Sequence, residues 1–157
     1  MSLLPLFQWM ASVPFFQGTW SDYLGPGLNV VHLLAMVVFT GALLIVDLRL
    51  LGGVLKQHPV APIARDAQPW LVGGFLMLVA TGIPAVMATA MTQYRNPMFW
   101  YKMYFLLAGI IFTFTIRHRV ARADEARLGP IWPKVVGLVS IALWGTVAAS
   151  ARLIMLL

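Results

Sequence analysis

The chain has 157 residues, of which 61% are apolar and only 10% are charged. Soluble domains carry roughly 45–50% apolar and about 25% charged residues, so this composition excludes an ordinary water-soluble domain. The absence of cysteine also excludes disulfides, iron–sulfur clusters and thiolate metal sites. The net charge is +6, but the basic residues lie between long apolar runs, which is typical of membrane topology signals and not of nucleic-acid binding.

Residues 1–27 predict a short helix that lies at the membrane surface. They contain no Lys or Arg and three prolines interrupt them, so they lack the basic start and continuous apolar core of a cleaved signal peptide. Aromatic rings at headgroup depth are typical of interfacial segments. The aromatic residues that indicate such a segment are Trp9, Phe15, Phe16, Trp20 and Tyr23. We expect this segment to cover one mouth of a helix bundle.

The longest apolar run predicts a transmembrane helix over about residues 28–50. An uncharged run of this length crosses roughly 30 Å of hydrocarbon at about 1.5 Å per residue. His32 stands near its start, and Asp47 and Arg49 stand near its end. An ionisable side chain inside a span is costly to remove from water, so His32 is the first candidate functional residue.

Three further transmembrane helices are expected, over about residues 70–91, 98–116 and 135–156. The segment between the first and second helices contains three prolines, which should prevent a continuous helix there. The predicted fold is therefore all-α, a transmembrane four-helix bundle with an N-terminal interfacial helix. We expect a single integral membrane domain over residues 1–157, with residues 1–27 as its interfacial segment.

The distribution of Lys and Arg orients this bundle in the membrane. Eight of the eleven basic residues lie in or beside the loops after the first and third helices, and residues 1–48 contain none. Positively charged loops stay on the cytoplasmic side. We therefore expect a multi-pass protein of the bacterial cytoplasmic (inner) membrane, with both termini outside and the lipid bilayer as its surroundings.

In this orientation, three polar side chains from three helices should meet near the outer face. His32 begins the first helix, Lys102 begins the third, and Arg152 lies near the end of the fourth. A neutral imidazole can ligate haem iron, and cationic side chains can pair with haem propionates. In the alternative interpretation, the two cations extend to the lipid headgroups and His32 hydrogen-bonds a neighbouring helix.

Methionine thioethers form a second candidate set of ligands. Met36 follows His32 at i+4, on the same helix face, and is a possible second ligand to the iron. Other methionines should flank the outer ends of the second and third helices, namely Met87, Met91, Met98 and Met103. Thioethers with an imidazole also suit Cu(I). In the alternative interpretation, these side chains fill the core of the bundle, as methionine commonly does.

At the cytoplasmic end, Asp47 is a candidate partner for Arg49, Arg117 or Arg119, in which case the pair would fix helix ends. His118 could ligate a second redox centre, although a solvated side chain is the simpler interpretation.

Small residues should let the helix backbones approach closely. The glycines concerned are Gly41, Gly73, Gly74, Gly82, Gly109, Gly137 and Gly145.

Two stretches of the sequence resemble known proteins. The run from Trp20 to Gly52 and the sequence Asn-Pro-Met-Phe-Trp-Tyr-Lys-Met at 96–103 resemble a family of uncharacterised bacterial inner-membrane proteins with four helices. More distantly, His32 and Lys102 resemble a His and a Lys of bacterial membrane protoporphyrinogen oxidases, which implies a role in haem or porphyrin binding. The bundle size, His32 and the methionines resemble the membrane domain of copper-resistance D-type proteins.

The sequence thus predicts an integral membrane protein that binds haem b, similar to a b-type cytochrome, with a role in electron transport. His32 would be the axial ligand and metal-binding residue, Met36 a possible second ligand, and Lys102 and Arg152 the partners of the propionates. A membrane or periplasmic redox partner is expected. Two alternatives stay open: copper import or delivery through His32 and the outer methionines, and a non-catalytic accessory subunit of a larger complex or an oligomer. Whether the chain is an enzyme also stays open.

Overall fold

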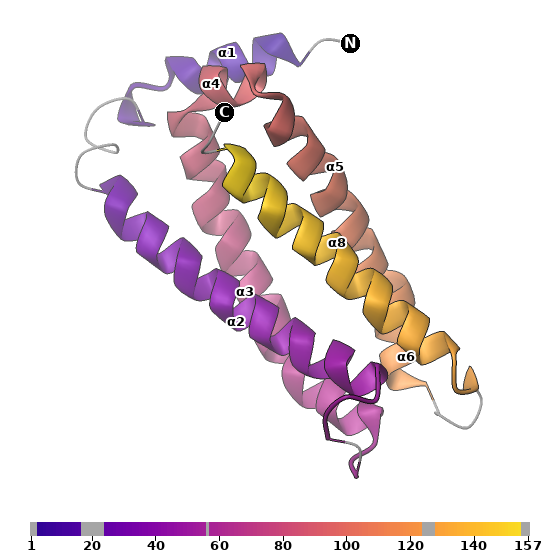
Figure 1. Ribbon diagram of the computed structural model, residues 1–157. Coiled ribbons are helices and arrows are strands. Elements are labelled where there is room, and N and C mark those ends of the chain that lie inside the picture. The colour runs from indigo at the N-terminus through magenta and orange to yellow at the C-terminus, as the bar shows by residue number, and fades with distance from the viewer. Residues whose placement is uncertain (1–2, 17–23, 56, 124–127, 155–157) are drawn as a thin grey trace.

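The computed structural model describes residues 3–16, 24–55, 57–123 and 128–154, and the regular structure in these ranges is helical throughout (Figure 1). Four helical stretches are long and apolar enough to cross a membrane, which confirms the all-α four-helix transmembrane fold. In chain order the elements are α1 (Leu4–Ser12), η1 (Pro14–Phe16), α2 (Gly25–Leu50), α3 (Val60–Ala88), α4 (Ala90–Arg95), α5 (Pro97–Phe112), η3 (Thr113–Arg117), α6 (His118–Arg122) and α8 (Trp132–Ile154).

The four spans form two antiparallel pairs. α2 packs along α3, and α5 packs along α8, while α8 also contacts α2 and α6 contacts α3 (Figure 1). α1 lies across one end of the bundle, close to α4 and to the end of α8 (Figure 1). We call this the α1 end, and we call the opposite end, where α2 stops and α8 begins, the α6 end.

The helix α1 covers its end of the bundle through one aromatic anchor. Phe7 is buried, and its ring centroid lies 5.2, 6.0 and 5.7 Å from three aromatic rings of α4 and α5. The amino-terminal segment therefore lies over a bundle mouth, as the sequence predicts. Trp20 and Tyr23, which belong to the same prediction, lie outside the described residues.

The helix α3 begins at Val60, so the prediction of a loop up to about residue 70 was wrong. Pro59 precedes the helix in an extended conformation, and Pro62 lies in the first turn. The N–H groups of a first turn have no partner within the helix, so a proline there costs no hydrogen bond. Pro69 lies inside the helix. The turns before it stay helical because the side chains of Val60 and Ala64 are buried in the core at the α6 end.

The third span also extends beyond its predicted end at residue 116. α5 passes into the π-helical segment η3 and then into α6, so the helix continues to Arg122. The prediction of a basic loop starting at Arg117 was wrong because this arginine is buried, with only 5% of its surface exposed. Its charge is paired with a carboxylate inside the bundle.

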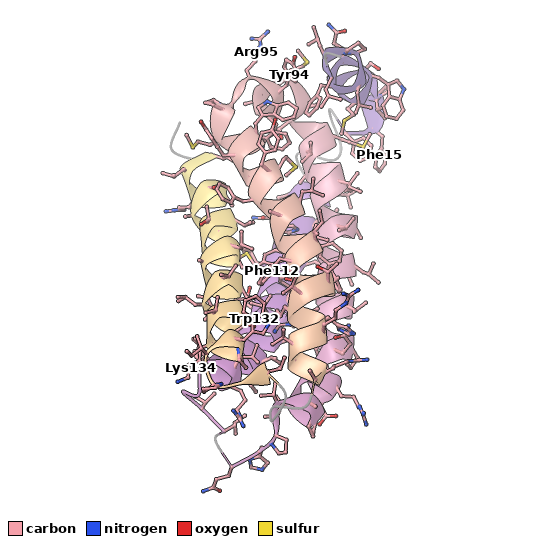
Figure 2. The ribbon with its side chains drawn as sticks, turned by 90° about the vertical axis from the view of Figure 1, so that its right-hand side faces the viewer. Phe15, Tyr94, Arg95, Phe112, Trp132 and Lys134 are labelled. Carbon is pink, nitrogen blue, oxygen red and sulfur yellow. The ribbon has the colours of Figure 1, made fainter. Side chains whose placement is uncertain are left out.

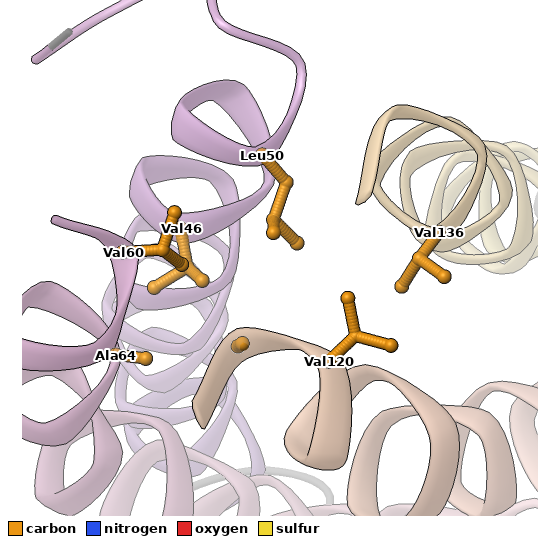
Figure 3. Close-up of a cluster of buried hydrophobic side chains, with 7 residues drawn as sticks. Val46, Leu50, Val60, Ala64, Val120 and Val136 are labelled. Carbon is orange, nitrogen blue, oxygen red and sulfur yellow. The ribbon is translucent and has the colours of Figure 1, made fainter. Parts of the chain in front are cut away.

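The core at the α6 end is built from small side chains of all four spans (Figure 3). It consists of Val46, Leu50, Val60, Ala64, Val120, Ala121 and Val136.

Nearer the middle of the bundle, Trp144 of α8 contacts both α2 and η3 and so joins the two helix pairs. Its ring centroid lies 4.6 Å from that of Phe39 in α2, and its Nε1 donates a hydrogen bond to Thr113 Oγ1 in η3 at 3.0 Å. The bundle is therefore closed by packing in its middle and at the α6 end.

Two of the predicted glycine contacts let α2 approach its neighbours closely. A Cβ atom added at Gly74 of α3 would lie 3.0 Å from the backbone nitrogen of Phe39, and one added at Gly137 of α8 would lie 2.9 Å from the carbonyl oxygen of Asp47. Real Cβ atoms rarely come so near to backbone, so only glycine fits at these two positions. Within the described residues, the predicted glycines with no such neighbour within 4 Å are Gly41, Gly73 and Gly145.

An ion pair inside the bundle ties α2 to η3. Arg117 Nε lies 2.5 Å from Asp47 Oδ1, and Arg117 Nη2 donates a hydrogen bond to the carbonyl of Leu43 at 2.9 Å. Ser140 of α8 lies beside the same carboxylate, but the geometry falls short of a hydrogen bond, and within the described residues neither Ser140 Oγ nor Asp47 Oδ2 has a hydrogen-bond partner. Of the three arginines predicted as partners for Asp47, Arg117 is confirmed.

We expect the substitution Asp47→Leu to destabilise the bundle by about 3–5 kcal/mol, because it leaves the Arg117 guanidinium buried without a counter-charge. The double substitution Asp47→Leu with Arg117→Met should recover most of this loss, since it removes both charges together. Unfolding of the purified variants by SDS titration in mixed micelles measures the difference. A single variant as stable as the wild type would contradict the structural role of the pair.

The neighbouring glycines of α3 provide a matched pair of substitutions. Gly74→Ala should destabilise the bundle by about 1–3 kcal/mol, because the new methyl group meets the backbone of α2 and the helices must move apart. Gly73→Ala adds the same methyl group in open space and should leave stability unchanged or raise it by up to about 1 kcal/mol. The same denaturant titration compares them, and equal effects of the two variants would argue against this packing.

Candidate functional site

The imidazole of His32 lies between α2 and α3, towards the α1 end of the bundle. It is half-buried, and its Nδ1 lies 2.7 Å from Oγ1 of Thr81, a buried residue of α3. The next residue, Gly82, faces the ring, and a Cβ atom added there would lie in ordinary van der Waals contact with His32 Cε1, at 3.5 Å. The alternative interpretation, in which His32 hydrogen-bonds a neighbouring helix, is therefore confirmed for Nδ1, and its role as a ligand stays a prediction.

The hydrogen bonds of Thr81 determine which nitrogen of His32 carries the proton. Thr81 Oγ1 lies 2.7 Å from the carbonyl oxygen of Met77, which can only accept a hydrogen bond. A hydroxyl has a single proton, so when Thr81 donates it to Met77 it accepts a hydrogen bond from His32 Nδ1. The tautomer is assigned from this network, and we expect the neutral ring in the Nδ1–H form. Its other nitrogen, Nε2, has a free lone pair and makes no hydrogen bond within the described residues.

Lys102 of α5 is the second polar group at this site. Its side chain is half-buried, and the positive charge of its amine acts electrostatically on the imidazole of His32. In the part of the chain that the structure describes, the amine of Lys102 makes no hydrogen bond or ion pair. A cation that is partly removed from water and has no counter-charge is costly in a membrane span. The site thus combines an available imidazole nitrogen with an unpaired positive charge.

The other two predicted site residues lie on exposed surfaces. Met36, one helical turn after His32, has 40% of its surface exposed, and Arg152 is exposed near the end of α8. Met36 belongs to the first half of α2 and Arg152 to the last turn of α8, and these parts of the two helices lie towards the α1 end (Figure 1). Lys102 lies within electrostatic range of His32, and within the described residues Met36 and Arg152 make no hydrogen bond or ion pair with either residue. The roles of these two residues as ligand and propionate partner stay predictions.

Two of the five predicted methionines pack against the core at the α1 end, which confirms that interpretation for these two alone. Met91 and Met103 lie against a cluster of buried side chains formed by Phe7, Ala90 and Phe99, directly beneath α1. Within the described residues there is also no group of three or more His, Asp, Glu or Cys side chains that could hold a metal ion. Of these four residue types, His32 is therefore the ligand that the site between α2 and α3 offers to a metal ion.

Sequence reasoning missed Thr81, the residue that orients His32. A hydroxyl in the middle of an apolar span is a usable signal, because such side chains bond either to their own helix or to a neighbour. Thr81 does both, since it donates to the carbonyl of Met77 and accepts from His32.

In the neutral ring of His32, the proton can be on Nδ1 or on Nε2. We expect the isosteric substitution Thr81→Val to make these two tautomers more equally populated, because Nδ1–H loses its hydrogen-bond acceptor. Thr81→Ser keeps a hydroxyl and is the matched control. Nitrogen-15 NMR of histidine-labelled protein, at a pH where the ring is neutral, reports the two forms directly. The wild type and Thr81→Ser should show a protonated Nδ1, and Thr81→Val a mixture. A wild-type ring protonated at Nε2 would contradict the assignment.

Comparison with known proteins identifies the family of the chain but not the chemistry of this site. No curated protein and no solved structure matches the chain. The more distant resemblances, to protoporphyrinogen oxidases and to copper-resistance D-type domains, therefore find no support. A family described as a family of unknown function (DUF6644) matches residues 7–156, which agrees with the expected relation to uncharacterised proteins. The chain belongs to this family, DUF6644.

Proposed function

We propose that this protein binds haem b within the membrane through His32 and takes part in electron transfer. The observation that carries the proposal is the position of the imidazole: Nδ1 lies 2.7 Å from Thr81 Oγ1, so Nε2 is directed away from that bond and has no hydrogen-bond partner within the described residues. Histidines that ligate metals are commonly fixed in this way, by a hydrogen bond from the ring nitrogen that does not face the metal. Bound haem would supply one-electron redox chemistry.

The amine of Lys102 gives the site a preference for an anionic ligand. It lies in electrostatic range of His32, on a different helix, and is unpaired within the described residues. A carboxylate of a haem propionate would neutralise this charge through a short, charge-assisted hydrogen bond. Haem offers both groups that the site requires, an iron that takes one imidazole and carboxylates at the edge of the same molecule.

Haem fits the available ligands better than a bare metal ion does. The porphyrin supplies four of the ligands to its iron, so a single histidine from the protein is enough. A copper ion would need several soft side chains, and Met91 and Met103 pack, partly buried, against the apolar cluster beneath α1 and not against His32. Copper handling therefore has less support than haem binding. The expected placement of this site on the periplasmic side of the bacterial inner membrane, with a redox partner there, is part of the proposal.

The absorption spectrum of protein produced with added haem tests the proposal. The wild type should show a Soret band after purification, and His32→Ala should lose it. His58→Ala is the matched control, because His58 is exposed in the connection between α2 and α3 at the α6 end, and it should keep the band. Lys102→Gln should raise the Kd for haem about tenfold, measured by haem titration of the apoprotein, because one charge-assisted bond is lost.

Two results would overturn haem binding by His32. One is wild-type protein that carries no Soret band although haem supply was adequate. The other is a His32→Ala variant whose band is unchanged in position and intensity.

A further inference from the structure

A groove of about 520 Å³ opens at the α1 end, away from His32. It lies where α4 meets α5, next to the end of α8, and it is lined by Met91, Thr92, Arg95, Asn96, Pro97 and Ile154. The amide of Asn96 donates to the carbonyl of Ile154 at 3.4 Å, which joins the two sides of the groove. Its volume is within the range of about 300–1,000 Å³ that is usual for small-molecule sites.

The polar lining of this groove provides hydrogen-bond donors and one positive charge. Arg95 is exposed at the end of the bundle, opposite the end that holds Lys134 (Figure 2), and Thr92 adds an exposed hydroxyl. None of the six lining residues has a carboxylate. This chemistry favours a phosphate group and gives no partner for an ammonium group.

The backbone N–H groups at the start of α5 are not available to a phosphate group in the groove, so the side chains must bind it. Pro97 has no N–H, Met98 N donates to Asn96 Oδ1 at 2.9 Å, and Phe99 N donates to Asn96 O at 3.2 Å. The amide groups that make helix N-termini attractive to anions are therefore already bonded. Arg95 is the charged group on which recognition depends.

The other half of the groove is apolar and continues onto surfaces that face the lipid. Met91, Pro97 and Ile154 form this half. Tyr101, one turn further along α5, and Leu153 of α8 are 55% and 43% exposed. A ligand in the groove would thus meet donors at its head and exposed apolar side chains along its tail. That combination is typical of a membrane lipid at the depth of its headgroup.

We infer that this groove binds the headgroup of an anionic phospholipid, with the phosphate against Arg95 and Thr92 and the acyl chains along α5 and α8. The preference for an anionic over a zwitterionic lipid follows from the absence of a carboxylate among the lining residues. The site is independent of haem, since neither His32 nor Lys102 is among the residues that line it.

Native mass spectrometry of the delipidated full chain, titrated with phosphatidylglycerol or phosphatidylcholine, tests this inference. The wild type should retain one phosphatidylglycerol more tightly than phosphatidylcholine. Arg95→Gln should weaken this retention about tenfold, the expected cost of one hydrogen bond to a charged group, and Thr92→Val should weaken it less. Lys134→Gln, which removes an exposed charge at the opposite end, is the control and should retain the lipid.

Several results would overturn the inference. Equal retention of the two lipids by the wild type would remove the preference for an anionic headgroup. Unchanged retention by Arg95→Gln, or the same loss in Lys134→Gln, would remove the groove as its location. Displacement of the lipid by inorganic phosphate alone would show a site for small anions instead of a lipid site.

Discussion

The absence of water from the membrane interior is the constraint on which this structure depends, because each polar group in a span must find its partner within the protein. Some side chains meet this requirement locally. Ser150, for example, donates to a carbonyl one turn earlier in its own helix. Others bond between helices and so determine how the helices pack, as Arg117 does with Asp47 and His32 with Thr81. Polar side chains therefore fix the arrangement of an otherwise apolar bundle.

The two polar centres differ in how completely their groups are partnered. At the α6 end, opposite charges neutralise each other and lie beside a core contributed by all four spans (Figure 3). Towards the α1 end, an imidazole nitrogen and the amine of Lys102 have no partner within the described residues. The centre whose charges are neutralised is suited to holding the helices together, and the centre with an unpaired charge is suited to receiving a ligand. This contrast is why the proposed function rests on His32 and not on Asp47.

The sequence alone was sufficient for the number of spans, since each contains enough consecutive apolar residues to cross a bilayer. It was insufficient for the start of α3, because the burial of Val60 and Ala64 outweighs the local signal of the prolines. The wrong start of α3 also placed Thr81 at the wrong depth in the membrane, so its contact with His32 was not predicted. In an antiparallel pair, residues at equal distances from the connection lie at the same depth, and only the earlier start of α3 brings Thr81 level with His32. The exposure of Met36 could not be predicted from its i+4 spacing to His32. Two residues on the same face of a helix can differ in burial, because the neighbouring helix need not cover both of them.

The π-helical segment η3 lets the third span differ in length by one residue without changing the inside of the bundle. A π-turn holds one residue more than an α-turn, whereas in a regular α-helix each added residue rotates the rest of the chain by about 100°. Deleting a single residue before Arg117 in this segment would therefore restore a regular helix and leave the guanidinium facing Asp47. The same deletion in the regular part of α5 would turn the guanidinium away from the carboxylate.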